Sequence, residues 1–215
     1  DSTIFGIGIR PATRNVPCAS RHRQRHPSHY LKIVCTLMQP LDIIRKYYKP
    51  DTALYDTLVC HSTAVRDKAL TLAARHPELH IDTAFVAEAA MLHDIGIFET
   101  NAPNIFCRGT HAYIEHGYLG AELLRREQLP RHALVCERHT GTGLTIEQIV
   151  KRQLPVPQRD MRPVSIEEQL ICYADKFFSK SHLDVEIPPA SVRAKLAKFG
   201  KDSVRQFDAW QRLFD

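Results

Sequence analysis

The sequence predicts an all-α fold, and three observations support that prediction. Apolar residues recur at three- and four-residue steps in several segments, which is the period of one helix face. Residues that favour helix starts and helix ends bracket these segments. Polar and apolar residues show no strand-type alternation. With 215 residues, 44% of them hydrophobic and 25% charged, the chain can build one helical bundle with its own core.

The first predicted helix runs from Ala53 to about Arg75, and its apolar stripe includes His61. A second begins after Asp82, a favourable N-cap, and ends at Gly96, which suits the left-handed conformation that often follows a helix. The last turn of this helix then contains His93 and Asp94.

Residues 98–112 lack a period and are expected to form a loop. A third helix follows, with His116 and several leucines on one side. A short fourth helix, from about Arg131 to His139, opens at Pro130 and is ended by Gly141-Thr142-Gly143. Thr145 and Gln148 form a potential capping box for another short helix.

The last third of the chain contains a proline-rich loop over residues 152–164 and then a second capping box, Ser165 with Glu168. Asp175 lies inside the apolar stripe of the helix that this box opens. Two closing helical segments are expected near Ser191 to Phe199 and Asp202 to Phe214. Their aromatic residues either cap the core or form a dimer face, and core packing is the expectation.

The net charge of +5 resides entirely in residues 1–37, which hold six basic side chains and one acid. The rest of the chain has 23 basic and 23 acidic side chains, so it is neutral. A neutral body argues against a nucleic-acid groove within the fold, although a basic arm could still contact phosphates. We expect residues 1–37 to be a disordered basic arm or a non-native extension ahead of Met38, and residues 38–215 to be the folded domain.

Cysteine usage and hydropathy bear on the compartment. The six cysteines have no CxxC spacing, which is typical of reduced thiols in the cytoplasm rather than of a disulfide framework or a zinc ribbon. No run approaches the roughly 18 apolar residues that a membrane span needs, and no clear secretory signal is present. The sequence therefore predicts a cytoplasmic protein with no membrane partner.

Five predicted helices each place a good metal ligand on or beside an apolar face. A single such histidine is more often a core residue bonded to a carbonyl, but a buried carboxylate is costly unless it meets a cation or several donors. Convergence on one interior point would remove these costs, as in bundles that hold a divalent metal. Mixed nitrogen and oxygen ligands suit iron, manganese, zinc or cobalt. The candidate ligands are His61, His93, Asp94, His116, His139 and Asp175.

These residues resemble the signature of a known family. The set of His61, His93-Asp94-Ile95-Gly96 and Asp175 is similar to that of the HD superfamily of metal-dependent phosphohydrolases, in its HDIG variant. The segments 116–122, 137–141 and 173–176 resemble the binuclear branch, which includes symmetrical diadenosine tetraphosphate hydrolases. The resemblance covers roughly residues 53–180. It departs from the HD-GYP phosphodiesterases, because His139 has no adjacent second histidine and a GYP segment is missing.

The resemblance implies an HD-domain helical bundle with two metal ions in its core. His61, His93, Asp94 and Asp175 would hold the first ion, and His116 and His139 would hold the second, with Asp94 bridging. The implied function is hydrolysis of a nucleotide or nucleotide polyphosphate by attack of a metal-bound hydroxide on phosphorus.

Residues around the ligands are candidates for contact with a phosphate substrate. Lys176, next to Asp175, is assigned a catalytic role together with Asp94, and Arg66, Arg108 and His111 are assigned to the substrate, although each can also be a solvated surface charge. Tyr113 could stack on a base or pack in the core.

Three other functions remain open at this stage. A mononuclear HD nucleotide monophosphatase would leave His116 and His139 without a metal. A diiron oxygenase could use the same ligands for a different chemistry. A non-catalytic nucleotide or metal sensor, helped by the basic arm to bind nucleic acid, belongs to a different class and has less need of the full ligand set. A homodimer is compatible with all of them.

Overall fold

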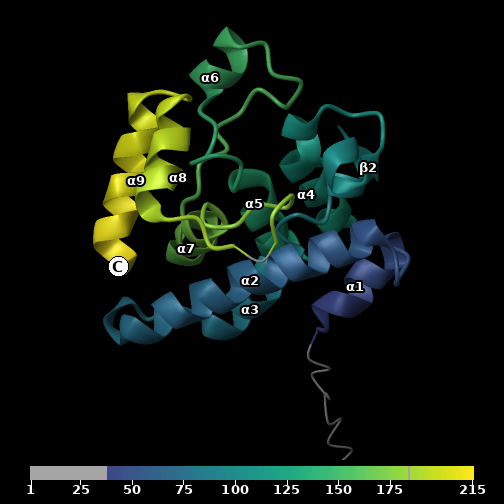
Figure 1. Ribbon diagram of the computed structural model, residues 1–215, viewed down its shortest axis with the longest axis horizontal. Coiled ribbons are helices and arrows are strands. Elements are labelled where there is room, and N and C mark those ends of the chain that lie inside the picture. Colours follow the sequence, from purple (N-terminus) through teal and green to yellow (C-terminus); the bar gives the residue numbers. More distant parts are fainter. Residues whose placement is uncertain (1–37, 184) are drawn as a thin grey trace, which may run out of the picture. The chain divides into compact units, whose positions relative to one another are not determined.

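The computed structural model describes residues 38–183 and 185–215, so the expectations for the basic arm lie outside the described residues. Helices dominate this part of the chain, as predicted (Figure 1). The α-helices are α1 (Pro40–Tyr47), α2 (Ala53–Arg75), α3 (Thr83–Leu92), α4 (His116–Arg126), α5 (Pro130–Arg138), α6 (Ile146–Lys151), α7 (Ile166–Asp175), α8 (Pro189–Ala197) and α9 (Lys201–Phe214). Short 3₁₀ turns are η1 (Pro77–Leu79), η2 (Ile97–Glu99), η3 (Pro103–Ile105) and η4 (Tyr113–Glu115).

Most predicted helix starts are confirmed by the capping contacts. The Asp82 side chain accepts a hydrogen bond from Phe85 N, and Thr145 and Gln148 cap α6 reciprocally. At α7 only half of the predicted box forms, because Ser165 Oγ accepts from the Glu168 amide while the Glu168 carboxylate binds Val164 N and Arg138.

The predicted left-handed conformation of Gly96 is wrong. Its φ is −84°, and the chain continues from α3 through tight turns into η2. Glycine is needed here for space: a Cβ would lie 2.3 Å from His116 O and 2.4 Å from Gly120 N. The segment that follows α3 therefore packs directly on the backbone of α4.

Two elements were not predicted. Helix α1 precedes the first predicted helix, and the Tyr48 hydroxyl that follows it donates to Ile95 O at 2.7 Å, beside the candidate ligands. Within the expected loop of residues 98–112, β1 (Asn101–Ala102) and β2 (Cys107–Arg108) form a short antiparallel hairpin.

The core consists of two large clusters of apolar side chains and a small third one around Ile149, Val156 and Met161. The first large cluster joins α2, α3, α5, α7, α8 and α9, and the second joins α1, α2, α3, α4 and α5. Helices α2 and α3 lie side by side and contribute to both (Figure 1). Along α2, Leu58 belongs to one cluster and Val65 to the other, so His61 lies where the two clusters meet. The candidate ligands are thus placed in the interior by the packing of both clusters.

The closing helices confirm core packing at three of their four aromatic residues. Phe207, Trp210 and Phe214 are buried, whereas Phe199 is 55% exposed. No disulfide joins any of the cysteines in the described part of the chain. Among those residues, too, none of the helices has the length and apolar character that crossing a membrane would require.

Candidate metal centre

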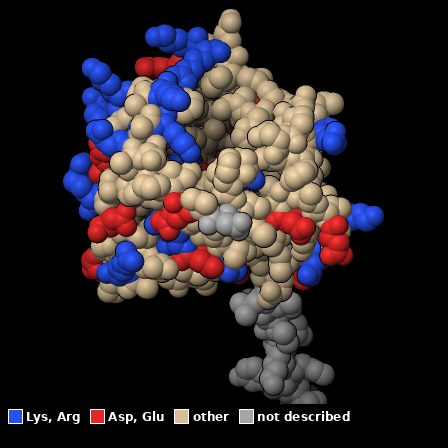
Figure 2. Space-filling view, viewed as in Figure 1, with Lys and Arg blue, Asp and Glu red and all other residues tan. Residues whose placement is uncertain are grey.

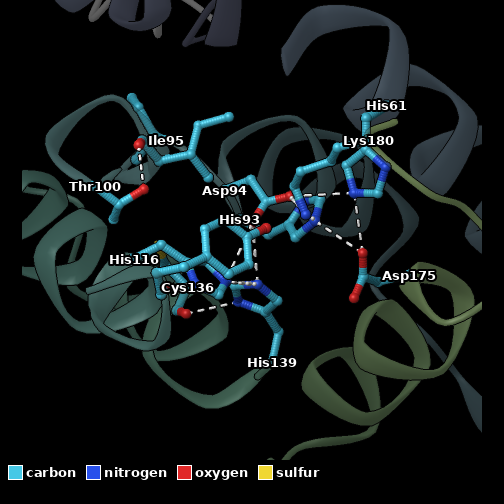
Figure 3. Close-up of polar contacts among 12 residues, drawn as sticks. His61, His93, Asp94, Ile95, Thr100, His116, Cys136, His139, Asp175 and Lys180 are labelled. Carbon is cyan, nitrogen blue, oxygen red and sulfur yellow. Dashed lines mark hydrogen bonds and ion pairs between the residues drawn. The ribbon is translucent and has the colours of Figure 1, made fainter. Parts of the chain in front are cut away.

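The six predicted ligands converge on one interior point (Figure 3). None is more than 9% exposed. His61 comes from the middle of α2, whereas the other five residues lie at or beside helix ends. Asp175 is the last residue of α7. As expected from a turn at the end of a helix, the adjacent residues His93 and Asp94 both reach the cluster.

Asp94 divides the cluster into two halves. Its Oδ2 lies 3.1 Å from the Nε2 atoms of both His61 and His93, and His61 Nε2 lies 3.0 Å from Asp175 Oδ1. Its Oδ1 lies 3.2 Å from His139 Nε2 and 3.5 Å from His116 Nε2. The potential ligand atoms within each half lie within 4.8 Å of one another. One carboxylate is therefore shared between two groups of ligands.

The three histidines at helix ends are oriented in the same way. Nδ1 of each donates to the backbone carbonyl three residues earlier: His93 to Ala90 O at 2.7 Å, His116 to Tyr113 O at 2.6 Å, and His139 to Cys136 O at 2.7 Å. Ala90 and Cys136 lie in the last turns of α3 and α5, where carbonyls lack intrahelical partners and are free to accept. Tyr113 O also accepts the backbone N–H of His116 in η4. Because a carbonyl can only accept, Nδ1 carries the proton and the Nε2 of a neutral ring presents a lone pair to the cluster.

A cation fits these contacts better than protein groups alone. The Nε2 atoms of His116 and His139 face each other at 3.0 Å, which brings two lone pairs together. Neither oxygen of Asp94 receives a hydrogen bond of good geometry, although both are fully buried. Buried lone pairs that face one another are costly, and a metal ion between them would satisfy them together. Asp94 Oδ1 is contacted by His116 and His139, whereas Oδ2 also has Lys180 Nζ beside it at 2.6 Å. The residues thus fit the binding of metal ions, and the contacts from Nδ1 to the carbonyls are of the kind that orients histidine ligands.

Two lysines balance the two carboxylates. Lys176 Nζ lies 2.7 Å from Asp175 Oδ2 and donates to His139 O at 3.0 Å. Lys180 Nζ lies 2.6 Å from Asp94 Oδ2. Sequence reasoning missed Lys180, because it follows the end of α7 in a segment without helical period, and its only signal was its closeness in sequence to Asp175.

These charges shift the pKa values of the cluster. Burial acts against the charged form of Asp94 and Asp175, but neighbouring lysines and histidines hold the pKa of both carboxyls well below its usual range. Burial lowers the pKa of His93, yet the two carboxylates outweigh it and raise this pKa to about 9. At His116, burial and the neighbouring His139 lower the pKa to about 3.

The predicted substrate contacts lie further out. Arg66 pairs with Asp67 at 2.7 Å, His111 pairs with Glu115 at 3.1 Å, and Arg108 is exposed on β2. None of the three is among the described residues that line the two cavities beside the cluster. Tyr113, in contrast, stacks on the His116 ring with centroids 4.7 Å apart and lines both cavities.

Comparison with known proteins matches residues 58–179 to the HD domain family. An uncharacterized protein of Methanocaldococcus jannaschii is 33% identical over 150 residues, which cover 66% of this chain and 79% of that protein. Two relatives are named tRNA (cytidine(56)-2'-O)-methyltransferase. The one from Picrophilus torridus is 34% identical over 60% of this chain and 33% of its own length. The one from Thermoplasma volcanium is 30% identical over 69% of this chain and 38% of its own length. No solved structure matches.

Proposed function

Because the chain belongs to the HD domain family, whose members are generally metal-dependent hydrolases, we propose that it hydrolyses a phosphate ester or anhydride bond of a nucleotide. The observation that supports the proposal most directly is the division of the ligands around Asp94. A carboxylate with one oxygen toward each half is the arrangement that a bridged pair of ions requires. Iron, manganese, zinc and cobalt suit the nitrogen and oxygen ligands.

The charge balance favours a phosphate substrate over simple metal storage. Asp94 and Asp175 contribute two negative charges, and Lys176 and Lys180 contribute two positive charges. When the histidines are neutral, as metal binding requires, the protein groups of the cluster carry no net formal charge. Two divalent ions would then leave a strongly positive interior, which a phosphate group with several negative oxygens can balance.

The chain's own residues then have distinct tasks. When bound, the ions supply an activated water near neutral pH and neutralise phosphate oxygens as charge develops. Asp94 holds the two halves in a fixed relation, and the carbonyl contacts of His93, His116 and His139 fix their ring orientation. Lys180 also lines a cavity of about 530 Å³, where its ammonium group can contact a substrate phosphate.

A nucleoside or dinucleoside polyphosphate is the first substrate class to test, because the segments 116–122, 137–141 and 173–176 resemble symmetrical diadenosine tetraphosphate hydrolases. The names of the two methyltransferases describe proteins of which the match covers two fifths or less. Methyl transfer is therefore not carried over to this chain.

The deciding experiment measures metal content and phosphate release on one sample. Protein purified without added metal is analysed for its elements and then assayed against nucleoside mono-, di- and triphosphates and dinucleoside polyphosphates. We expect two metal ions per chain and hydrolysis of at least one nucleotide. One ion with release only from monophosphates would favour the mononuclear enzyme. Oxygen consumption without phosphate release would favour the oxygenase. Neither metal nor turnover after anaerobic iron or manganese loading would contradict the proposal and favour a sensor.

A further inference from the structure

A second, apolar cavity opens beside the His116 half of the metal centre. Its volume is about 410 Å³, and it lies between η4, the turn at residues 140–144, α6 and the junction of α8 and α9. Tyr113 and His116 line it, so the cavity adjoins the metal centre at His116. Figure 2 shows a hollow in the viewed face, with Lys and Arg side chains gathered along the side where α6 and α8 lie. A ligand held in this cavity would therefore lie next to His116, one of the six residues of the metal centre.

Two aromatic rings stand at this cavity. Tyr113 is 37% exposed and Phe199 is 55% exposed, although the other aromatic residues of the closing helices are buried. Aliphatic side chains complete the walls, among them Leu144, Leu154 and Leu196. Exposed aromatic rings beside a concave apolar surface are typical of sites that bind flat ligands by stacking.

A hydrogen bond from Arg152 and the glycine at position 141 shape the wall of this cavity. Arg152 Nη2 donates to Phe199 O at 3.0 Å, which ties α6 to the junction that carries the phenylalanine. Gly141 has φ +62°, and a Cβ built on it would meet nothing within 4 Å. The space beside this glycine is therefore open, and its left-handed conformation, which side chains rarely adopt, keeps the position free of a side chain.

The other side of Tyr113 is chemically different. The cavity of about 530 Å³ there is lined by Lys180 and by the polar residues Asn101, Asn104 and Ser179. One tyrosine thus separates an apolar cavity from a polar one that holds a lysine, and both adjoin the metal centre. A molecule with a flat apolar part and an anionic part matches this arrangement.

We propose that the apolar cavity binds the nucleobase of the substrate and that Tyr113 and Phe199 are its stacking rings. Thr142, Gln148 and Arg152 also line this cavity and carry polar groups. These groups favour a base over an aliphatic group, because a base can form hydrogen bonds with them and an aliphatic group cannot. This inference rests on the proposed function and adds to it the part of the fold that would recognise the nucleobase.

The first test measures binding without turnover. Calorimetry on the metal-loaded protein compares the four common ribonucleosides with ribose, because none of these carries a phosphate that could be hydrolysed. At least one nucleoside should bind at least about tenfold more tightly than ribose, as base stacking on aromatic side chains suggests. If no nucleoside binds more tightly than ribose, the cavity does not bind a base.

The second test uses Phe199, whose exposure makes its replacement tolerable for folding. Phe199→Ala should weaken nucleoside binding about tenfold, and Phe199→Trp should restore it. The matched control is Phe106→Ala, because Phe106 is 51% exposed and lines neither cavity. Equal weakening by the control, or no weakening by Phe199→Ala, would overturn the assignment.

Kinetics separates this inference from the proposed function. With a nucleoside triphosphate, Phe199→Ala should raise KM about tenfold and leave kcat unchanged, while KM for inorganic tripolyphosphate should not change. If the wild-type protein hydrolyses both compounds with equal KM, the phosphohydrolase stands and the base site fails. If it hydrolyses neither, the proposed function fails, and nucleoside binding alone decides the site.

Discussion

The two halves of the metal centre share Asp94 but differ in charge. The half at Oδ2 contains a second carboxylate, Asp175, and both lysines of the cluster contact its carboxylate oxygens. The half at Oδ1 consists of His116 and His139, with Asp94 as the only acid in its ligand group among the described residues. Protein charges therefore stabilise the carboxylates of the first half, whereas the second half is a pair of histidines that shares only Asp94 with the first.

The largest effect is expected from Asp94, because it belongs to both halves. Asp94→Asn keeps the shape but removes the charge and one metal-binding oxygen. Both ions should be lost and turnover should fall by more than about a hundredfold. Elemental analysis and phosphate release measure this, with circular dichroism to show that the variant is folded. Full activity with two bound ions would refute the shared role.

Variants that affect one half test whether the halves bind ions separately. His61→Gln should remove the ion of the first half, and His139→Gln should remove the ion of the second, so each should bind one ion per chain instead of two. Elemental analysis after dialysis gives the stoichiometry. Loss of both ions from His139→Gln would show that the first half depends on the second.

The two lysines should differ in what they affect. Lys180 lines the polar cavity, so Lys180→Gln should raise KM for a phosphate substrate about tenfold in the metal-loaded protein. Lys176 instead joins Asp175 to the carbonyl of His139, so Lys176→Gln should lower the free energy of unfolding by about 1–3 kcal/mol. Steady-state kinetics and urea denaturation on both variants separate the two roles. An unchanged KM in Lys180→Gln, with a raised KM in Lys176→Gln, would return the catalytic assignment to Lys176.

The pH dependence of stability should also differ between the halves in metal-free protein. The folded pKa of His93 is about 9, above its ordinary value of 6.5. Its contribution to stability is therefore complete below pH 6.5 and is lost as the pH rises through 9. The folded pKa of His116 is about 3, so protonation of the unfolded chain lowers stability as the pH falls from 6.5. The alkaline arm should be worth up to about 3 kcal/mol and the acid arm up to about 5 kcal/mol.

Urea denaturation between pH 4 and pH 10, in the presence of a chelator, should give a maximum near pH 6.5. His93→Gln should flatten the alkaline arm and leave the acid arm, and His116→Gln should reduce the slope of the acid arm. A profile without an alkaline decline in the wild-type protein would contradict the charge difference between the halves.

The sequence predicted most of the fold, and it predicted the residues that the structure brings together around Asp94, because both have a local signal. Asp82 and Thr145 cap helices where their side-chain chemistry predicted, and His61 lies inside the apolar stripe that made it a candidate. Gly96 was misjudged because its requirement is a close approach to α4, which involves residues twenty or more positions away. The position of Lys180 next to Asp94 and the apolar cavity at Phe199 both depend on tertiary contacts between segments that have no helical period. No local sequence pattern could therefore predict them.

The smallest effects are expected at Arg66, Arg108 and His111, which sequence reasoning assigned to the substrate. Arg66 and His111 each have an acidic partner, and their side chains are 34% and 44% exposed. Arg108 is also exposed. Exposed charges contribute little to binding because solvent and salt screen them. Alanine at each position should therefore raise KM less than about threefold at physiological salt and somewhat more at low salt. Within residues 38–183 and 185–215, no acidic side chain forms an ion pair with Arg108. Arg108→Ala should therefore show the largest of the three changes in KM. A larger change at any of them than at Lys180 would mean that the substrate extends over the outer surface rather than into the polar cavity.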